Sequence, residues 1–184
     1  MPEEAAAVLT GLARAAIEHG VRLRRDAPVT DEPAWLRQAG AAFVTLTIER
    51  RLRGCIGSLI AHRPLGQDVA ANARAAAFDD PRFPPVRSGE VSRLAIEVSV
   101  LGVPEPMSFS GRDDALRQLR PGLDGVILAA GGRRATFLPQ VWDELPQPER
   151  FLAHLLAKAG LPPDYWNETV RLQRYTVTAY TEPE

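Results

Sequence analysis

The residues best suited to chemistry surround the single cysteine of this 184-residue chain. Cys55 follows Arg53 and Gly54, and Gly57 stands two positions later. Side chains on a strand alternate between its two faces, so Arg53 and Cys55 share a face and lie about 7 Å apart. A guanidinium beside a thiol favours the nucleophilic thiolate, and glycines allow a ligand to approach closely. The pattern predicts a reactive or ligand-facing thiol, with Cys55 as the catalytic group and Arg53 and the two glycines around its ligand.

The stretch around Cys55 is predicted to be the second strand of a β-hairpin. Residues 43–48 alternate β-branched and apolar side chains, residues 49–51 form a charged turn, and residues 52–60 make a second apolar run. In this arrangement the thiol points away from the core. The alternative is structural, because a lone cysteine is often a small buried hydrophobe and a glycine in a strand often marks a bulge.

Two further residues are candidates for moving a proton to or from the thiol. Glu97 lies in the middle of a predicted strand over residues 93–101, among apolar neighbours, where a covered carboxylate must find a partner. His62 follows the Cys55 strand, and a Cys/His pair is a common way to activate sulfur. The structural alternatives are a glutamate paired with an arginine and an exposed loop histidine.

A proline-rich loop provides a possible binding platform. It begins Asp79-Asp80-Pro81-Arg82, and two prolines follow Phe83, so that its backbone is held extended. The planar guanidinium of Arg82 suits a carboxylate or phosphate. Asp80 and Arg82 are therefore candidate ligand-binding residues, and the alternative is that they clasp each other within the loop.

The composition narrows the classes of function. The formal net charge is −1 and no aromatic residues are interleaved with the arginine clusters, which argues against a nucleic-acid partner. One cysteine and three histidines without ligand spacing predict no metal site, and no cofactor motif is present. The acidic N-terminus and the lack of an apolar run of about 18 residues argue against a secretory signal and a membrane span. We expect a cytoplasmic protein.

The remaining patterns predict an α+β fold, with a mixed, mostly antiparallel sheet flanked by helices. Apolar residues at helical spacing mark four helices, over residues 3–19, 64–77, 112–119 and 151–159. Gly20 is the predicted end of the first helix. Alternating patterns mark later strands over residues 126–130, 133–138 and 172–180, of which the first two form a hairpin across Gly131-Gly132. Residues 26–39 are predicted to be a loop with at most a short helical turn.

The string Leu52-Arg53-Gly54-Cys55-Ile56-Gly57 resembles the signature of the AMMECR domain family, whose bacterial members are called AmmeMemoRadiSam system protein A. Further blocks agree with the family in order along nearly the whole chain. They run from Gly40 to Leu46, Asp80 to Val86, Glu97 to Leu101, Gly122 to Leu128, Leu138 to Trp142 and Lys158 to Pro162. Residues 142–146 depart from the pattern by being shorter than the corresponding family stretch.

The resemblance implies one compact AMMECR-type domain over residues 1–184, with a larger and a smaller lobe. It also implies a Memo-type partner, similar to metal-dependent extradiol dioxygenases, and a radical S-adenosylmethionine enzyme partner. It establishes no catalytic residue. Two hypotheses follow. One is a thiol-dependent enzyme, in which Cys55 attacks its substrate and Glu97 or His62 moves the proton. The other is a non-catalytic adaptor or substrate-presenting module that docks through the Arg-Gly-Cys strand.

Overall fold

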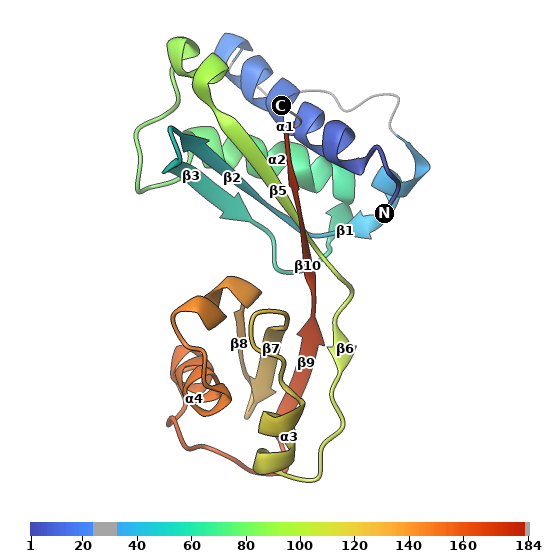
Figure 1. Ribbon diagram of the computed structural model, residues 1–184, viewed down its shortest axis with the longest axis vertical. Coiled ribbons are helices and arrows are strands. Elements are labelled where there is room, and N and C mark those ends of the chain that lie inside the picture. Colours follow the sequence, from blue (N-terminus) through green and yellow to red (C-terminus); the bar gives the residue numbers. More distant parts are fainter. Residues whose placement is uncertain (24–32, 183–184) are drawn as a thin grey trace. The chain divides into compact units, whose positions relative to one another are not determined.

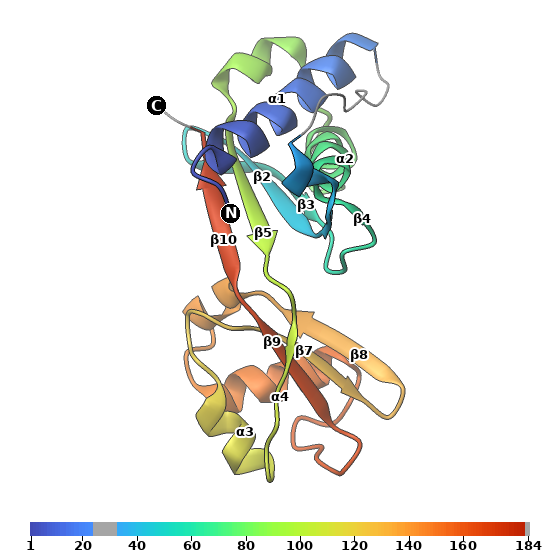
Figure 2. The ribbon, with the colours of Figure 1, turned by 90° about the vertical axis from the view of Figure 1, so that its right-hand side faces the viewer.

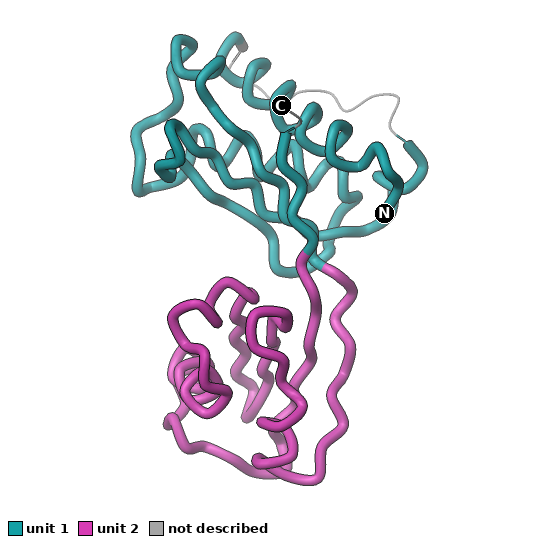
Figure 3. The backbone as a smooth tube through the Cα atoms, in the orientation of Figure 1, with its two compact units in different colours: residues 1–101, 178–184 teal, residues 102–177 magenta. Residues whose placement is uncertain are grey.

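The computed structural model describes residues 1–23 and 33–182. The chain divides into two compact units (Figure 3). Unit 1, the larger, comprises residues 1–101 and 178–184, and unit 2 comprises residues 102–177. Both units combine helices with antiparallel strand pairs, so the predicted α+β class is confirmed.

Unit 1 is built on a four-stranded sheet. Its strands lie in the order β10-β5-β2-β3, which places β3 at an edge. The bounds are Ala42–Ile48 for β2, Arg51–Gly57 for β3, Ala95–Leu101 for β5 and Val177–Thr181 for β10. The central strand β2 pairs antiparallel with both β3 and β5, and the predicted hairpin over residues 43–60 therefore forms.

Two helices cover one face of this sheet (Figure 1). They are α1, Ala5–Leu23, and α2, Leu65–Phe78. Alternate residues of β2, such as Val44 and Leu46, point into the core beneath them. Helix α2 meets the sheet mainly through alanines, and such small side chains allow the helix to approach the strands closely.

Helix α1 runs further than the sequence indicates. It continues through Gly20 to Leu23 instead of ending at the glycine. A Cβ atom at position 20 would clash with the ring of Phe78 from α2. Gly20 is therefore a packing residue that lets two helices come together, and the interpretation of it as a helix stop was wrong.

Short elements join the parts of unit 1. Strands β1, Ala39–Gly40, and β4, Arg63–Pro64, pair with each other. Two 3-10 turns, η1 and η2, cover Ala34–Arg37 and Ser88–Arg93. The short turn predicted within residues 26–39 corresponds to η1, whereas residues 26–32 lie outside the described part of the chain.

Unit 2 has a second four-stranded sheet in the order β6-β9-β7-β8. Its strands are β6, Glu105–Pro106, β7, Gly125–Ala130, β8, Arg133–Phe137, and β9, Arg171–Tyr175. Its helices are α3, Arg112–Gln118, the 3-10 turn η3, Pro139–Asp143, and α4, Pro148–Lys158. In its core Trp142 stacks on Phe151 with ring centroids 3.7 Å apart. The predicted hairpin across Gly131-Gly132 is confirmed, and both glycines have positive φ.

The final predicted strand is divided between the two units. The alternating run over residues 172–180 breaks at Thr176, so β9 belongs to the unit 2 sheet and β10 to the unit 1 sheet (Figure 2). The carbonyl of Thr176 accepts a hydrogen bond from the Gly102 N–H at 2.8 Å instead of joining a regular ladder. Periodicity alone cannot show this break, because both halves have the same alternation.

The turn between β2 and β3 yields a stability prediction. Its two central residues, Glu49 and Arg50, have φ values of 53° and 63°, in the region that favours glycine. Arg50→Gly should raise the free energy of unfolding by about 1 kcal/mol, measured by urea denaturation. Arg51→Gly is the matched control, because Arg51 is an exposed strand residue, and it should lower stability by about 1 kcal/mol. A loss of stability in Arg50→Gly would contradict the assigned turn.

Candidate functional site

The thiol of Cys55 lies on the face of the unit 1 sheet opposite the helices. The preceding residue, Gly54, faces α2 so closely that a Cβ atom there would overlap the carbonyl oxygen of Ala76. Because neighbouring residues on a strand point to opposite faces, Cys55 points outward. The residue as a whole is half-buried.

A β-bulge sets this orientation. The two-residue turn pairs Ile48 with Arg51 and Thr47 with Leu52, but Leu46 then pairs with Gly54, so that Arg53 is the extra residue. Without the bulge, Cys55 would lie opposite Val44 and face the core, because a slip of one residue exchanges the two faces. With it, Cys55 lies opposite Thr45.

Three polar side chains form a row across the outer face. Cys55, Thr45 and Glu97 occupy adjacent register positions on β3, β2 and β5. The Cys55 Sγ lies 3.4 Å from the Thr45 Oγ1, within hydrogen-bond range for sulfur. Glu97 accepts a hydrogen bond at 3.2 Å from the hydroxyl of Ser99 on its own strand. Of the proton-moving candidates, the structure therefore places Glu97 in the same row as the thiol, with Thr45 between them.

The backbone of Cys55 is held by Asp80 and Arg82. Because β3 is an edge strand, the outward peptide groups of Cys55 have no neighbouring strand to bond. The N–H donates to the buried Asp80 carboxylate at 2.9 Å, and the C=O accepts from Arg82 Nη2 at 3.2 Å. Arg82 also donates two side-chain bonds to Asp80, at 2.7 and 3.0 Å. The predicted clasp between these residues forms, and it also takes the place of a strand along this edge.

The contact between Asp80 and Arg82 shifts the pKa values of both side chains. Hydrogen bonds from Arg82 hold the pKa of the Asp80 carboxyl far below its usual range against the opposing effect of burial, and the N–H groups of Cys55 and Arg82 act in the same direction. The carboxylate in turn raises the pKa of Arg82, to which the Cys55 side chain contributes further. The guanidinium that contacts Cys55 is therefore that of Arg82, through the carbonyl oxygen of the cysteine.

Arg53 pairs with Glu90, whereas the sequence pattern places it beside the Cys55 thiol. Its Nε and Nη2 donate to the Glu90 carboxylate at 2.9 and 3.1 Å, and this pairing is the main cause of a lowered pKa for Glu90. Its Nη1 is buried and has no hydrogen-bond partner among the described residues. The bulge removes Arg53 from the strand alternation, so the predicted side-by-side placement of Arg53 and Cys55 was wrong.

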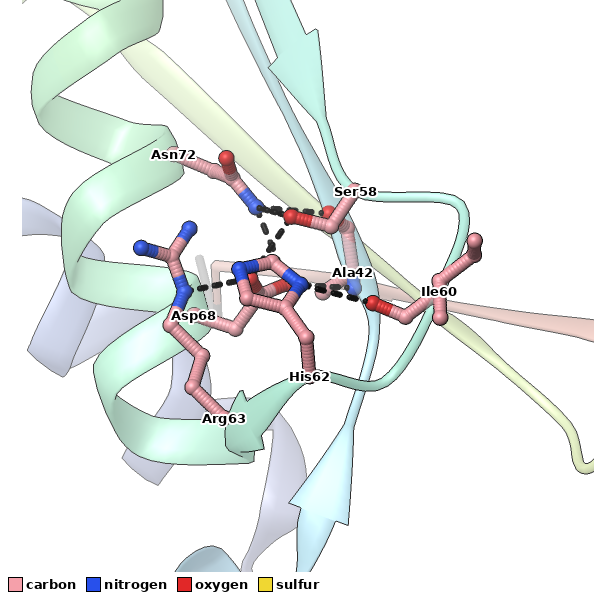
Figure 4. Close-up of polar contacts among 7 residues, drawn as sticks. All are labelled: Ala42, Ser58, Ile60, His62, Arg63, Asp68 and Asn72. Atoms are coloured by element: carbon pink, nitrogen blue, oxygen red, sulfur yellow. Dashed lines mark hydrogen bonds and ion pairs between the residues drawn. The ribbon is translucent and has the colours of Figure 1, made fainter.

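His62 lies on the loop over residues 58–63, beside a cluster of polar residues around Asp68 (Figure 4). It is exposed, and its Nδ1 lies 2.9 Å from the carbonyl oxygen of Ile60. Within the described ranges, no hydrogen bond joins it to Cys55. The carboxylate of Asp68 is fully buried and accepts hydrogen bonds from four groups: the Ala42 N–H, the Ser58 hydroxyl, Arg63 Nε and Asn72 Nδ2. This saturated carboxylate fixes both ends of the loop over residues 58–63.

The two glycines beside the thiol have packing roles. Gly54 allows the close approach of α2, and a Cβ atom at Gly57 would overlap the ring of Phe43 on the neighbouring strand. Their conformations are ordinary, since neither has a positive φ. The structure therefore explains both glycines without a ligand beside them.

Sequence reasoning missed Thr45, Glu90 and Asp68. Thr45 becomes a neighbour of the thiol only through the bulged register, and Glu90 meets Arg53 across 37 residues of sequence. Asp68 and Asn72, however, are one helical turn apart on a helix that otherwise presents alanine to the sheet, which was a usable hint of a polar cluster.

Within residues 1–23 and 33–182, no three His, Cys, Asp or Glu side chains converge in a way that could hold a metal ion. Among the helices of the same part of the chain, none is long and apolar enough to cross a bilayer.

The fold and site define an α+β protein of two units, whose larger unit carries a half-buried cysteine on the sheet face opposite the helices. The chain belongs to the AMMECR1 family, whose model matches residues 10–180. It is 38% identical to a protein of Methanothermobacter thermautotrophicus, over 95% of this chain and 92% of the relative. A protein of Thermococcus gammatolerans is 41% identical, over 95% and 88%. The crystal structure of an uncharacterised protein of Pyrococcus horikoshii, PH0010, superposes with a TM-score of 0.83 at 36% identity, over 97% of this chain and 92% of that one.

The contact between Gly54 and α2 gives a first prediction for the site. Gly54→Ala should lower the free energy of unfolding by about 3 kcal/mol or more, because the added methyl must displace backbone of α2 rather than a flexible side chain. Gly89→Ala serves as the control, since no atom lies within 4 Å of a Cβ at that position. Chemical denaturation of both variants measures the difference, and equal effects would show that α2 does not lie this close to β3.

The clasp gives a second prediction, on pH. Asp80→Asn should lower stability at pH 7 by about 2 kcal/mol, whereas Asp79→Asn, which changes an exposed ion pair, should cost well under 1 kcal/mol. Because the folded-state pKa of Asp80 lies below its unfolded value, its contribution is complete above about pH 5 and is lost as the pH falls. Denaturation curves at several pH values should therefore show the gap between wild type and Asp80→Asn narrowing below pH 4. A gap that widens in acid would contradict the assignment.

Proposed function

We propose that this chain acts through the thiol of Cys55 on an anionic, electrophilic substrate, as an enzyme or as an accessory in a modification pathway. The observation that carries the proposal is the outward-facing sulfur of the half-buried Cys55, 3.4 Å from the Thr45 hydroxyl. Arg82 supplies a half-exposed guanidinium beside the same residue, held in place by the buried Asp80. A fixed guanidinium recognises carboxylate or phosphate groups.

The proposed step is nucleophilic displacement at carbon. The Cys55 sulfur forms a bond to the electrophilic carbon as the bond from that carbon to its leaving group breaks. The thiol proton passes through the Thr45 hydroxyl to the Glu97 carboxylate and then to the departing group, so the step needs no oxidant or reductant. Thr45 acts as a relay because it lies between the other two in the row.

The resemblance to the family supports the proposed setting. A Memo-type protein and a radical S-adenosylmethionine enzyme are the proposed partners, either supplying the substrate or consuming the product. A reduced thiol requires a reducing compartment, so we propose a cytoplasmic location.

A non-catalytic adaptor role is the second candidate, and one observation favours it. Leu59 and Ile60 are exposed, with 41% and 57% of their surfaces accessible, on the loop over residues 58–63 that Asp68 holds at both ends (Figure 4). A pre-organised apolar loop suits docking to another protein. In an adaptor, Cys55→Ser would retain partner binding.

Selective alkylation of the thiol tests the enzymatic proposal. Cys55 should react with the anionic reagent iodoacetate faster, relative to neutral iodoacetamide, than free cysteine does. Arg82→Gln should lower this ratio by about threefold through loss of the local positive charge. Arg117→Gln, the same change at an exposed arginine of unit 2, should leave it unaltered. A ratio equal to that of free cysteine, or no dependence on Arg82, would refute anion recognition at the thiol and favour the adaptor.

A further inference from the structure

Unit 1 contains a cavity of about 530 Å³ that is separate from the thiol site. It lies where the end of α1, the end of α2 and the proline-rich loop meet, and α1 packs against η2 beside it. Its volume falls in the range of small-molecule sites. Neither Cys55, Thr45 nor Glu97 lines it.

One wall of the cavity is apolar and rigid. The Phe78 ring packs against Gly20 so closely that no larger residue fits there, which fixes the position of the ring. Pro84 and Pro85 continue this wall, and their backbone is locked in an extended form. The loop is tied back to α2 by the hydrogen bond from the Val86 N–H to the Ala77 carbonyl, at 2.8 Å. A flat apolar group can therefore lie against a preformed surface.

The other wall carries positive charge. Arg74 comes from α2 and Arg87 from the start of η2, so two guanidinium groups reach the cavity from separate elements. Among the described residues that line the cavity, Asp79 is the single carboxylate, and its contact with Arg74 Nη1 is 3.2 Å long. The described part of the lining therefore has two arginines and one aspartate, a formal charge of +1. Ser88 adds a hydroxyl.

We propose that this cavity binds a small organic phosphate that carries a planar apolar group. The phosphate lies between Arg74 and Arg87, whose guanidinium groups attract its charge and donate N–H groups to its oxygens. The planar group lies against Phe78 and the two prolines. A phosphate ester of about the size of a mononucleotide can contact both the charged and the apolar wall, whereas inorganic phosphate can contact only the charged wall.

Calorimetric titration of the full chain tests this assignment. The probes are adenosine 5′-monophosphate, phenyl phosphate, adenosine and inorganic phosphate. At least one of the two esters should bind at least about 10-fold more tightly than both inorganic phosphate and adenosine, and its affinity should fall with added salt. If neither ester binds by about 10 mM, the proposal is overturned.

Two charge-matched variants locate the binding. Arg87→Gln should weaken the ester by about 10-fold. Arg93→Gln, in the same 3-10 turn but paired with Glu49 outside the cavity, should leave the affinity unchanged. Thermal melts check that both variants fold. Equal losses in the two would indicate non-specific attraction and refute the site. Cys55→Ser should bind the ester normally, so this result is independent of the thiol chemistry.

Discussion

Helix α2 lies so close to strand β3 that only glycine fits between them at position 54. Together with the bulge at Arg53, this contact sets which face of β3 meets the core, so that Cys55 points outward. It also places the C-terminal end of α2 beside the sheet edge, and the loop that follows can then reach the backbone of Cys55. A helix one side-chain layer further away would leave that edge without its hydrogen-bond partners.

The loop after α2 contributes to both proposed sites. Asp80 and Arg82 satisfy the peptide groups that an edge strand leaves unpaired, and leaving such groups open invites pairing with another chain. The same loop, through Pro84 and Arg87, forms one side of the phosphate cavity. Its prolines suit both tasks, because a backbone with few alternative conformations loses little entropy when it is ordered.

Charge in unit 1 is arranged mostly in pairs. Arg53 binds Glu90, Arg82 binds Asp80 and Arg63 binds the buried Asp68. Such pairs offset part of the cost of removing a carboxylate from water and hold loops in place. Arg82 differs from the other two because its side chain is about half exposed, next to the Cys55 carbonyl oxygen, so that in the proposed function it holds the loop and also meets the ligand.

The sequence alone determined the α+β class, the two hairpins and the family, because these depend on local periodicity, turn residues and ordered motifs. The clasp between Asp80 and Arg82 was also foreseeable, since the two residues are neighbours in a rigid loop. Only the tertiary structure decided that Arg53 pairs with Glu90 and that the hydroxyl of Thr45 is the neighbour of the thiol. It also decided that α1 continues past Gly20 and that one alternating run serves two sheets. Each of these outcomes depends on a bulge, a close helix contact or a change of sheet, and long-range packing sets such features without leaving a local pattern.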